Sequence, residues 1–385
     1  MKILISGAGI AGLTLAWWLN RAGHEPVIVE KRNNPDDAGF MIDFYGSGFD
    51  VAEKMGLIDR LKERHYSMHE LIFVNRQGRR LGAMNIDKFR KLLNYRHYNF
   101  LRGDLESVLY ASIKDKVQIR FGTTITSINS DEKKVQAVSS DNSQWECDLL
   151  IGADGIHSHV RRLALGIGSE CEKFLGYYVV CGIIDNILDK RHVFLSRLEP
   201  GVQVAAYSID NNRLATFITF KSSKQIGHDR EARVSELKSI CKGMKWVVPE
   251  LVAETVKSPE FYFDAVSQVQ LSAWHKGRIG LVGDACQCLT LLAGQGASMA
   301  MAGAYYLAEK LEAAGGNFQK AFTDYENLLK PEIETRQAAA RKLAGSFVPE
   351  SWFSIGIVLL FMRFLFFPGF RRAIRRQVGA GSIIH

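Results

Sequence analysis

At the start of the chain, the spacing of apolar residues is typical first of a strand, then of a helix, and then of a strand again. Residues 2–6 are a short apolar run of strand character, residues 13–21 place apolar positions on one side of a helix, and residues 26–29 form a second apolar run. Residues 49–63 again show helical spacing. This order predicts a strand, a helix and a second strand, followed by a further helix.

Short strand-like runs recur over the next segment. Residues 70–74 and 81–84 flank a polar turn at 75–78, and we expect both to belong to a second sheet. Four more elements are predicted after them: a helix at 104–113, a strand at 117–121, a hairpin at 124–138 and a strand at 147–151.

Residues 173–272 differ, because strand-like runs follow one another with turn clusters between them. The predicted strands are 177–184, 192–198, 202–209 and 214–220, with one helix at 229–244. A strand at 278–282 and a helix of small residues at 297–314 come next. We therefore predict an α/β protein with a Rossmann-like, doubly wound domain (1–68, 98–172 and 273–331), an inserted, mostly antiparallel sheet domain covered on one side by helix (69–97 and 173–272), and a helical tail (332–385).

Three glycines fill the turn between the first strand and the first helix. Gly7, Gly9 and Gly12 have the GxGxxG spacing. In this setting the first glycine permits the tight turn, the second lets the backbone approach a pyrophosphate, and the third lets helix and strand pack closely. The helix N-terminus then faces the phosphates.

Glu30 ends the second strand, where a carboxylate accepts hydrogen bonds from a ribose and repels a 2′-phosphate. The segment predicts a dinucleotide site, for NAD or FAD rather than NADP.

Composition and charge exclude several classes of protein. The chain has 385 residues, 47% hydrophobic and 23% charged, as in globular proteins. Most of the net charge of +8 lies in residues 341–385, which carry seven basic groups and one acidic group. We therefore expect no nucleic-acid partner. The six cysteines are irregularly spaced and lack metal-site spacing, so we expect a reducing compartment and no metal site. The first strand leaves no room for a signal peptide, which also favours a cytoplasmic protein.

Two further glycine-bearing segments follow predicted strands. The first is Gly152-Ala153-Asp154-Gly155, and the second is Gly283-Asp284-Ala285 with Gly294-Gln295-Gly296 shortly after it. Together with the first segment and the Arg-x-x-Leu helix start at Arg102, they resemble the fingerprints of the class A, single-component FAD-dependent monooxygenases, the family of the aromatic hydroxylases. The resemblance spans residues 1–331. Residues 261–274 and 294–304 resemble the branch that includes the tetracycline-inactivating monooxygenases.

The resemblance implies FAD as the cofactor and indicates the residues that hold it. Asp284, after a strand at the sheet edge where ligands sit, would accept hydrogen bonds from ribityl hydroxyls. The helix that follows Gly294 would stabilise negative charge on the reduced ring. Arg102 matches an arginine near the pyrophosphate, and Asp154 lies in a motif used for FAD and, indirectly, for NAD(P)H. The predicted cofactor residues are Gly7, Gly9, Ala11, Gly12, Glu30, Lys31, Arg32, Arg102, Asp154, Asp284, Gly294, Gln295, Gly296 and Ala297.

The resemblance also implies a reaction. NAD(P)H would reduce the flavin, dioxygen would add to form a C4a-hydroperoxide, and one oxygen atom would pass to an electron-rich small organic substrate, aromatic or polycyclic. The sequence assigns no general base, because His157 and His159 are more typical of exposed or capping histidines. Two alternatives stay open: a flavin-dependent reductase or dehydrogenase of a lipid-like substrate, and a non-catalytic flavin- or ligand-binding protein.

Two positions depart from the family pattern. Cys286-Gln287 follows Ala285 where the family usually has alanine and histidine, and Leu291 stands where it usually has a proline. That proline shapes the face of the flavin on which oxygen and substrate meet. The second departure therefore concerns the geometry of hydroxylation rather than FAD binding.

The C-terminal tail is first apolar and then basic. Residues 352–367 contain a single charge, Arg363, and four arginines follow at positions 371–376. The apolar run is short for a bilayer span, which needs about 20 residues. We expect it to pack across the protein's own two domains. The alternative is peripheral contact of residues 352–376 with a membrane, which would make the protein membrane-surface associated.

Overall fold

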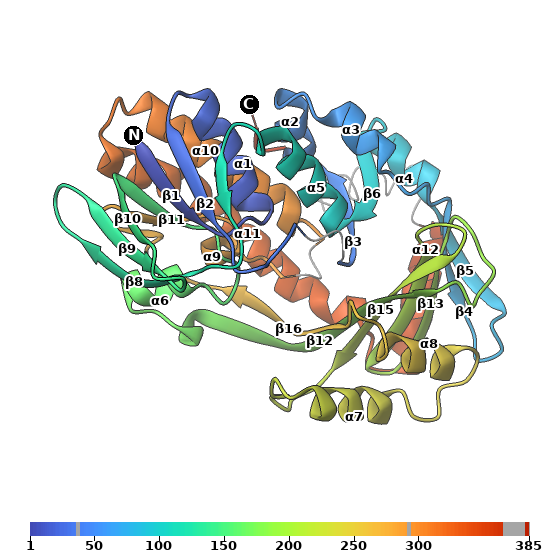
Figure 1. The fold of residues 1–385 in the computed structure, drawn as a ribbon. Coiled ribbons are helices and arrows are strands. Elements are labelled where there is room, and N and C mark those ends of the chain that lie inside the picture. The colour runs from blue at the N-terminus through green and yellow to red at the C-terminus, as the bar shows by residue number, and fades with distance from the viewer. Residues whose placement is uncertain (36–38, 291–293, 365–381, 385) are drawn as a thin grey trace.

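A mainly parallel six-stranded sheet organises one half of the molecule (Figure 1). The computed structural model describes residues 1–35, 39–290, 294–364 and 382–384. The strands of this sheet, in spatial order, are β17 (His275–Lys276), β18 (Ile279–Leu281), β11 (Leu149–Gly152), β1 (Lys2–Ser6), β2 (Glu25–Val29) and β7 (Gln118–Arg120). All neighbours are parallel except β17 and β18. The predicted doubly wound domain is confirmed.

The central strands of this sheet are buried on both faces. Helix α1 (Ile10–Arg21) packs against α5 (Arg102–Ile113) and α10 (Gly296–Ala313), and it also contacts β1 and β2. Ile3, Leu4 and Ile5 are almost completely buried in β1, so consecutive residues on opposite faces of the strand are both covered by protein. The carboxyl ends of β1, β11 and β18 therefore meet at one sheet edge, directly before the three glycine-bearing segments.

A seven-stranded sheet fills the other half. Its strands, in spatial order, are β16 (Tyr262–Val269), β12 (Glu172–Asp185), β15 (Arg213–Lys221), β14 (Val202–Ser208), β13 (Val193–Glu199), β4 (Glu70–Val74) and β5 (Arg80–Asn85). Only β13 and β4 pair in parallel. Helices α7 (Arg230–Ile240) and α8 (Val248–Thr255) pack on one face through Leu237 and Leu251. The mostly antiparallel sheet is confirmed, although α8 was not predicted.

Two long strands connect the halves (Figure 1). β12 has 14 residues, and its pairing with β16 shifts register between Phe174 and Tyr178. The far end of β16 reaches the third glycine-bearing segment, where the Val269 N–H donates to the Cys288 carbonyl at 3.3 Å. The predicted substrate sheet is therefore attached beside the predicted cofactor site.

Two predicted elements prove to be divided. The helix expected at 49–63 is two helices, α2 (Ser47–Lys54) and α3 (Ile58–Glu63), because Gly56 with φ +70° leaves the helical conformation between them. The strand expected at 147–151 changes sheets at Asp148: β10 (Gln144–Cys147) belongs to a three-stranded sheet with β8 (Ile125–Ser130) and β9 (Val135–Ser139). The remaining elements are β3 (Met41–Tyr45), which pairs with β6 (His97–Leu101), α4 (Ile86–Leu92), α6 (His159–Leu165), a 3-10 turn (Ser169–Cys171) and α9 (Asp284–Gln287).

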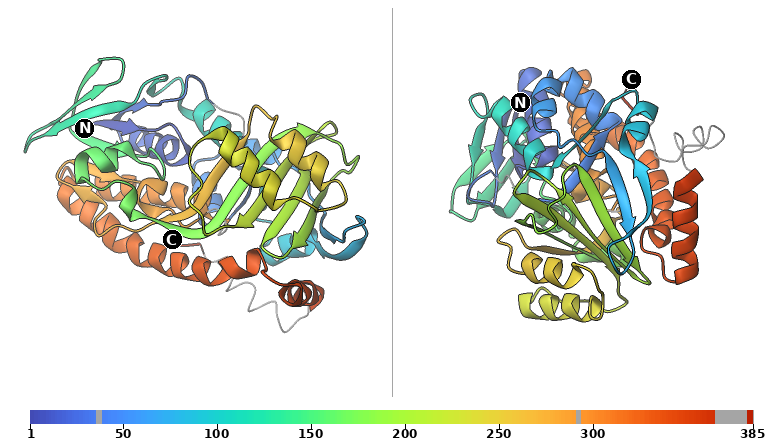
Figure 2. Two further views of the ribbon diagram at one scale, coloured as in Figure 1. Left: turned by 90° about the horizontal axis from the view of Figure 1, so that it is seen from below. Right: turned by 90° about the vertical axis from the view of Figure 1, so that its right-hand side faces the viewer.

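The C-terminal helices run along both halves. α11 (Phe318–Phe347) extends beneath the two sheets, and α12 (Trp352–Phe364) packs against β5 and β13 (Figure 2). Ile383 returns to the first half, where its N–H donates to the Ser47 hydroxyl at 3.1 Å. The expected self-packing is thus seen for α12 on the sheet domain, whereas residues 365–381 lie outside the described residues.

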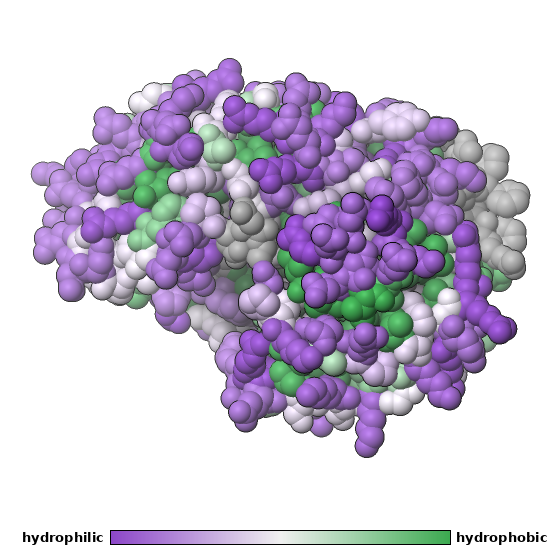
Figure 3. Space-filling view, turned by 45° about the vertical axis from the view of Figure 1, so that its right-hand side comes forward, coloured by the Kyte–Doolittle hydropathy of each residue, from purple (hydrophilic) through white to green (hydrophobic). Residues whose placement is uncertain are grey.

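Polar side chains cover most of the face drawn in Figure 3, with apolar side chains gathered toward its middle. Among the residues that the structure describes, no helix combines the length and hydropathy needed to cross a bilayer.

Candidate cofactor and substrate site

The three glycine-bearing segments converge at the edge of the parallel sheet. A Cβ atom on Gly7, whose φ is +110°, would lie 2.5 Å from the Ala153 carbonyl oxygen of the second segment. A Cβ atom on Gly283 would lie 2.6 Å from the Cβ of Ala11, which joins the third segment to the first. Contacts this close need glycine, so the segments predicted separately form one site.

Gly9 differs from the glycines around it. A Cβ atom on Gly12 would lie only 1.9 Å from the Gly7 carbonyl oxygen, whereas the nearest atoms to a Cβ on Gly9 are side-chain atoms of Arg102 and Glu106 at 3.6 Å. Packing within the protein therefore requires glycine at position 12 but not at position 9. The bare backbone at Gly9 fits close approach by a bound pyrophosphate.

Glu30 lies in a charged cluster beside this turn. Its carboxylate is buried and accepts from the Ala8 N–H at 2.6 Å and from the Arg32 N–H at 2.9 Å. Arg32 also pairs with Glu106 at 2.9 Å, and Arg102 pairs with Glu106 at 2.7 Å. The cluster holds the first turn in place. The predicted ribose contact of Glu30 stays a prediction, and Lys31 is exposed next to it.

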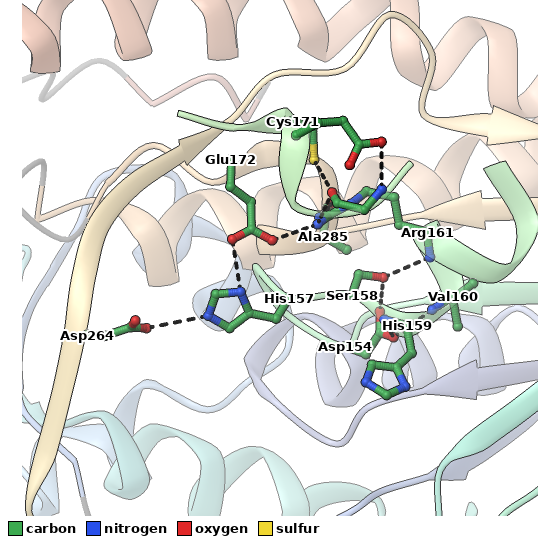
Figure 4. Close-up of polar contacts among 12 residues, drawn as sticks. Asp154, His157, Ser158, His159, Val160, Arg161, Cys171, Glu172, Asp264 and Ala285 are labelled. Carbon is green, nitrogen blue, oxygen red and sulfur yellow. Dashed lines mark hydrogen bonds and ion pairs between the residues drawn. The ribbon is translucent and has the colours of Figure 1, made fainter. Parts of the chain in front are cut away.

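Asp154 has a structural partner for each of its oxygens. One oxygen accepts from the Ser158 hydroxyl at 2.5 Å, and the other accepts from the N–H groups of His159 and Val160 at 2.8 and 3.0 Å. The carboxylate thus binds the N-terminus of α6 (Figure 4). Any contribution to FAD binding would come through the shape of this turn.

A buried arginine joins the second segment to the third and to the seven-stranded sheet. Arg161 is 1% exposed, donates to the Ala285 carbonyl at 3.0 Å and pairs with Glu172 of β12 at 3.0 Å (Figure 4). His157 lies 2.9 Å from the other oxygen of Glu172 and 3.9 Å from Asp264 of β16. The nearby carboxylates of Asp264 and Glu172 raise the pKa of His157. The sequence reasoning missed this network, for which Arg161 directly after the second segment was the available signal.

Asp284 follows β18 at the carboxyl edge of the parallel sheet. Its side chain is exposed, yet burial by the surrounding protein raises the pKa of its carboxyl, with Arg102 opposing that shift. We interpret this combination as a hollow between the two halves, which we call the cleft. Gly294 and Gly296 border open space as well, because a Cβ atom on either would meet nothing within 4 Å.

Gln295 and Ala297 complete the predicted set. The Gln295 amide donates to the Tyr45 hydroxyl at 3.4 Å and accepts from Arg336 of α11, and Ala297 is half-buried in the first turn of α10. These contacts fasten the N-terminus of α10 to β3 and α11.

We call Gly7–Gly12, Arg102, Asp284 and Gly294–Ala297 the cofactor wall. Its bare glycine backbone, helix N-termini and open carboxylate fit a dinucleotide carrying a ribityl chain.

We propose that Phe40 and side chains from β3 and β16 form the opposite wall of this cleft. Tyr262 is 38% exposed, donates to Asp264 at 3.1 Å and has its ring 5.8 Å from Phe40. Because strand residues alternate between faces, the neighbouring Phe263 points instead into the core beneath α7 and α8. Asp43 is half-exposed on β3. We use "opposite wall" for Phe40, Asp43, Tyr262 and Asp264.

Asp43 belongs to a polar cluster that the sequence did not indicate. Burial would raise its pKa, but hydrogen bonds from His97 at 3.0 Å and Asn99 at 2.5 Å lower the pKa of the carboxyl overall. Behind Asn99, His65 lies 2.9 Å from Arg90. Asp43 is therefore a carboxylate at neutral pH, held at the edge of the cleft.

The two positions that depart from the family pattern, Gln287 and Leu291, differ in what the structure shows of them. Gln287 is 2% exposed and donates to the Tyr325 hydroxyl at 2.5 Å, and its amide packs against Gly303. It is thus a core residue and does not line the cleft. Leu291 lies outside the described residues.

A doubly wound domain with this cofactor wall and an attached sheet that forms a second wall defines the class of FAD-dependent oxidoreductases. The chain belongs to the FAD binding domain family, whose model matches residues 1–321. It is a class A FAD-dependent monooxygenase, as the fingerprints suggested.

Relatives extend over nearly the whole chain. A flavin-dependent monooxygenase of Legionella longbeachae is 33% identical over 356 residues, 90% of each chain. The crystal structure of tetracycline destructase Tet(55) is 31% identical with a TM-score of 0.83, covering 94% of this chain and 96% of that one. HpxO of Klebsiella pneumoniae, solved with FAD and uric acid, has a TM-score of 0.82 over 99% and 97% of the two chains. At 20% identity, this last similarity shows the fold alone.

Proposed function

We propose that this monooxygenase uses NAD(P)H and dioxygen to hydroxylate an electron-rich, aromatic or polycyclic small molecule in the cleft between the two walls. The observation that carries the proposal is Asp284, an accessible carboxylate enclosed by protein where the three glycine-bearing segments converge. Its position after β18 is that of a ligand-binding residue in open α/β sheets.

The cofactor wall would hold FAD along its length. Gly9, Ala11 and the N-terminus of α1 would bind the pyrophosphate with help from Arg102, and Asp284 would bind the ribityl hydroxyls. The ring would lie against Gly294–Ala297. When bound, the flavin supplies hydride acceptance from NAD(P)H and the activation of dioxygen that the family resemblance implies.

The chain's own groups would orient and shield the reaction. α10 has 18 residues and begins at the cleft, so its N-terminal dipole stabilises negative charge there. β12 and β16 close the opposite side and exclude water. Burial and Asp264 hold the pKa of Tyr262 far above its usual range. Tyr262 therefore keeps its proton and would position the substrate rather than act as a base.

The substrate class has support from one relative and from the cleft. Tet(55), at 31% identity over most of both chains, is named for tetracycline, a polycyclic aromatic compound. Phe40 and Tyr262 offer aromatic surface on the opposite wall. We propose the domain division 1–68, 98–172 and 273–331 for FAD, 69–97 and 173–272 for substrate, and 332–385 for the tail.

The direct test replaces Asp284 by asparagine. We expect wild-type protein to be purified yellow and its flavin to bleach on anaerobic NAD(P)H addition, with oxygen consumed when a phenol, polyketide or isoprenoid library contains a substrate. Asp284→Asn should lose most of its FAD while keeping its circular dichroism spectrum. Full FAD in the variant would contradict the site, and substrate conversion without oxygen uptake would favour a reductase.

A further inference from the structure

Helix α12 is apolar on two opposite sides. Ile355 is 5% exposed and packs with Phe73 and Leu198 of the seven-stranded sheet. On the other side, three residues at helical spacing are more than half exposed: Phe353 (80%), Ile357 (53%) and Leu360 (55%). We call these three residues the outer face of α12. A helix that is apolar all round is normally covered on all sides.

The outer face concentrates the exposed apolar surface of the protein. Ten large apolar side chains are exposed in the described part of the chain, and five of them, including Trp352 at its first position, lie on α12. The right-hand view of Figure 2 shows α12 standing beside β4 and β5 at the margin of the molecule. Single exposed apolar residues are ordinary, whereas a cluster on one helix marks an interaction site.

The inner side of α12 is incompletely packed. A pocket of about 200 Å³, partly open to solvent, lies between the helix and the sheet and is lined by Phe73, Leu81, Arg197, Leu198, Trp352 and Leu359, among others. At this pocket the sheet contributes fewer contacts to α12 than a close-packed core would. The outer face lies on the solvent side of the helix.

The positive charge of the tail indicates which kind of partner the outer face of α12 would bind. Residues 351–385 contain five arginines and no acidic residue. At the first turn of α12, the guanidinium of Arg76 lies 5.5 Å from the centre of the Trp352 ring, and Arg76 is also paired with Glu199 at 3.6 Å, so the positive charge that distinguishes the tail comes from its own arginines. A second copy of the chain would bring the same positive charge to the contact. An anionic bilayer surface instead offers apolar depth and negative headgroups together.

We infer that the outer face of α12 docks on the surface of an anionic lipid bilayer. The three apolar side chains enter the headgroup boundary, and Trp352 lies at the interface, where tryptophan is favoured. The arginines of the tail sequence add electrostatic attraction that falls with salt. The docking is peripheral and involves no residue of the cofactor wall or the opposite wall.

Vesicle co-sedimentation of the full-length, FAD-loaded protein tests the inference. We expect pelleting with vesicles of phosphatidylglycerol and phosphatidylcholine, and little with phosphatidylcholine alone. The variant Phe353→Ser/Ile357→Ser/Leu360→Ser should bind the anionic vesicles about 100-fold more weakly, since three partly buried apolar side chains are lost. The matched control Tyr95→Ser/Leu163→Ser/Leu328→Ser removes three exposed apolar side chains elsewhere and should bind within about twofold of wild type.

Two results would overturn the inference. One is equal pelleting of the wild type and the α12 variant with anionic vesicles, provided that both keep their circular dichroism spectrum and yellow colour. The other is an α12 variant that turns a dimer into a monomer in size-exclusion chromatography while no protein binds vesicles, which would make the outer face a contact between copies of the chain. Neither result bears on FAD binding, so the proposed function is judged separately.

Discussion

The cofactor wall and the opposite wall of the cleft are built in different ways. On the cofactor wall, backbone contacts decide the residue: Gly7 and Gly12 each face a backbone atom less than 3 Å from where a Cβ would lie. On the opposite wall, Asp43 and Tyr262 are placed by strands far apart in the sequence and are held by side-chain hydrogen bonds. A local turn leaves a short pattern in the sequence, whereas a long-range assembly leaves none.

The largest expected effect concerns the arginine that joins the two walls. Arg161→Met should lower the free energy of unfolding by roughly 3–5 kcal/mol, because Glu172 would lose its buried partner and Ala285 its donor. Chemical denaturation of the apoprotein measures this. Arg162→Met, at the exposed neighbouring position, is the control and should change stability by no more than about 0.5 kcal/mol. Equal effects of the two changes would show that the Arg161 network does not hold the walls together.

The glycines of the first turn allow the cofactor wall to be divided further. Gly12→Ala should destabilise the apoprotein by roughly 3 kcal/mol, because its Cβ would lie 1.9 Å from the Gly7 carbonyl oxygen. Gly9→Ala has no neighbour closer than 3.6 Å, so it should fold normally but bind FAD about 100-fold more weakly. Thermal unfolding of the apoprotein and FAD titration separate the two. Wild-type FAD affinity in Gly9→Ala would place the pyrophosphate elsewhere.

The difference between the walls also explains what could be predicted from the sequence. The βαβ start, the inserted sheet and the three segments follow from short-range period and turn residues, and the structure confirms them as elements that converge. The sequence contains a signal for the division of the helix at 49–63, namely Gly56. The continuous apolar spacing on both sides of Gly56 nevertheless predicted a single helix. The Asp43–His97–Asn99 cluster had no signal, because β3 and β6 pair across more than fifty residues of intervening chain.

Tyr262→Phe tests the opposite wall without disturbing the cofactor wall. It removes one hydroxyl that donates to Asp264, so the fold and the FAD content should be unchanged. If the Tyr262 hydroxyl positions the substrate, KM should rise about tenfold with little change in kcat, the effect of losing one hydrogen bond. The exposed Tyr95→Phe serves as the control for loss of a tyrosine hydroxyl. A fall in kcat at constant KM would instead point to a role in the reaction step.

The smallest effect is a pH dependence of stability that arises behind Asp43. Burial lowers the pKa of His65 to about 4. Its ring lies between Arg90, which donates to one nitrogen at 2.9 Å, and the Asn99 carbonyl, 3.1 Å from the other. A proton added to the nitrogen that faces Arg90 would oppose that hydrogen bond. Between the unfolded value of 6.5 and about 4, the unfolded chain therefore binds more protons, and stability falls as the pH falls through this window.

His65 is partly exposed, so solvent screening reduces this contribution to roughly 1 kcal/mol. Denaturation between pH 7 and pH 4 measures it, and His65→Gln should remove the part of the slope above the range in which carboxylates titrate. His69→Gln, at an exposed histidine of the same segment, should leave the slope unchanged. An unaltered slope in His65→Gln would mean that the cluster behind Asp43 tolerates a second positive charge beside Arg90. The opposite wall would then be held by packing rather than by its hydrogen bonds.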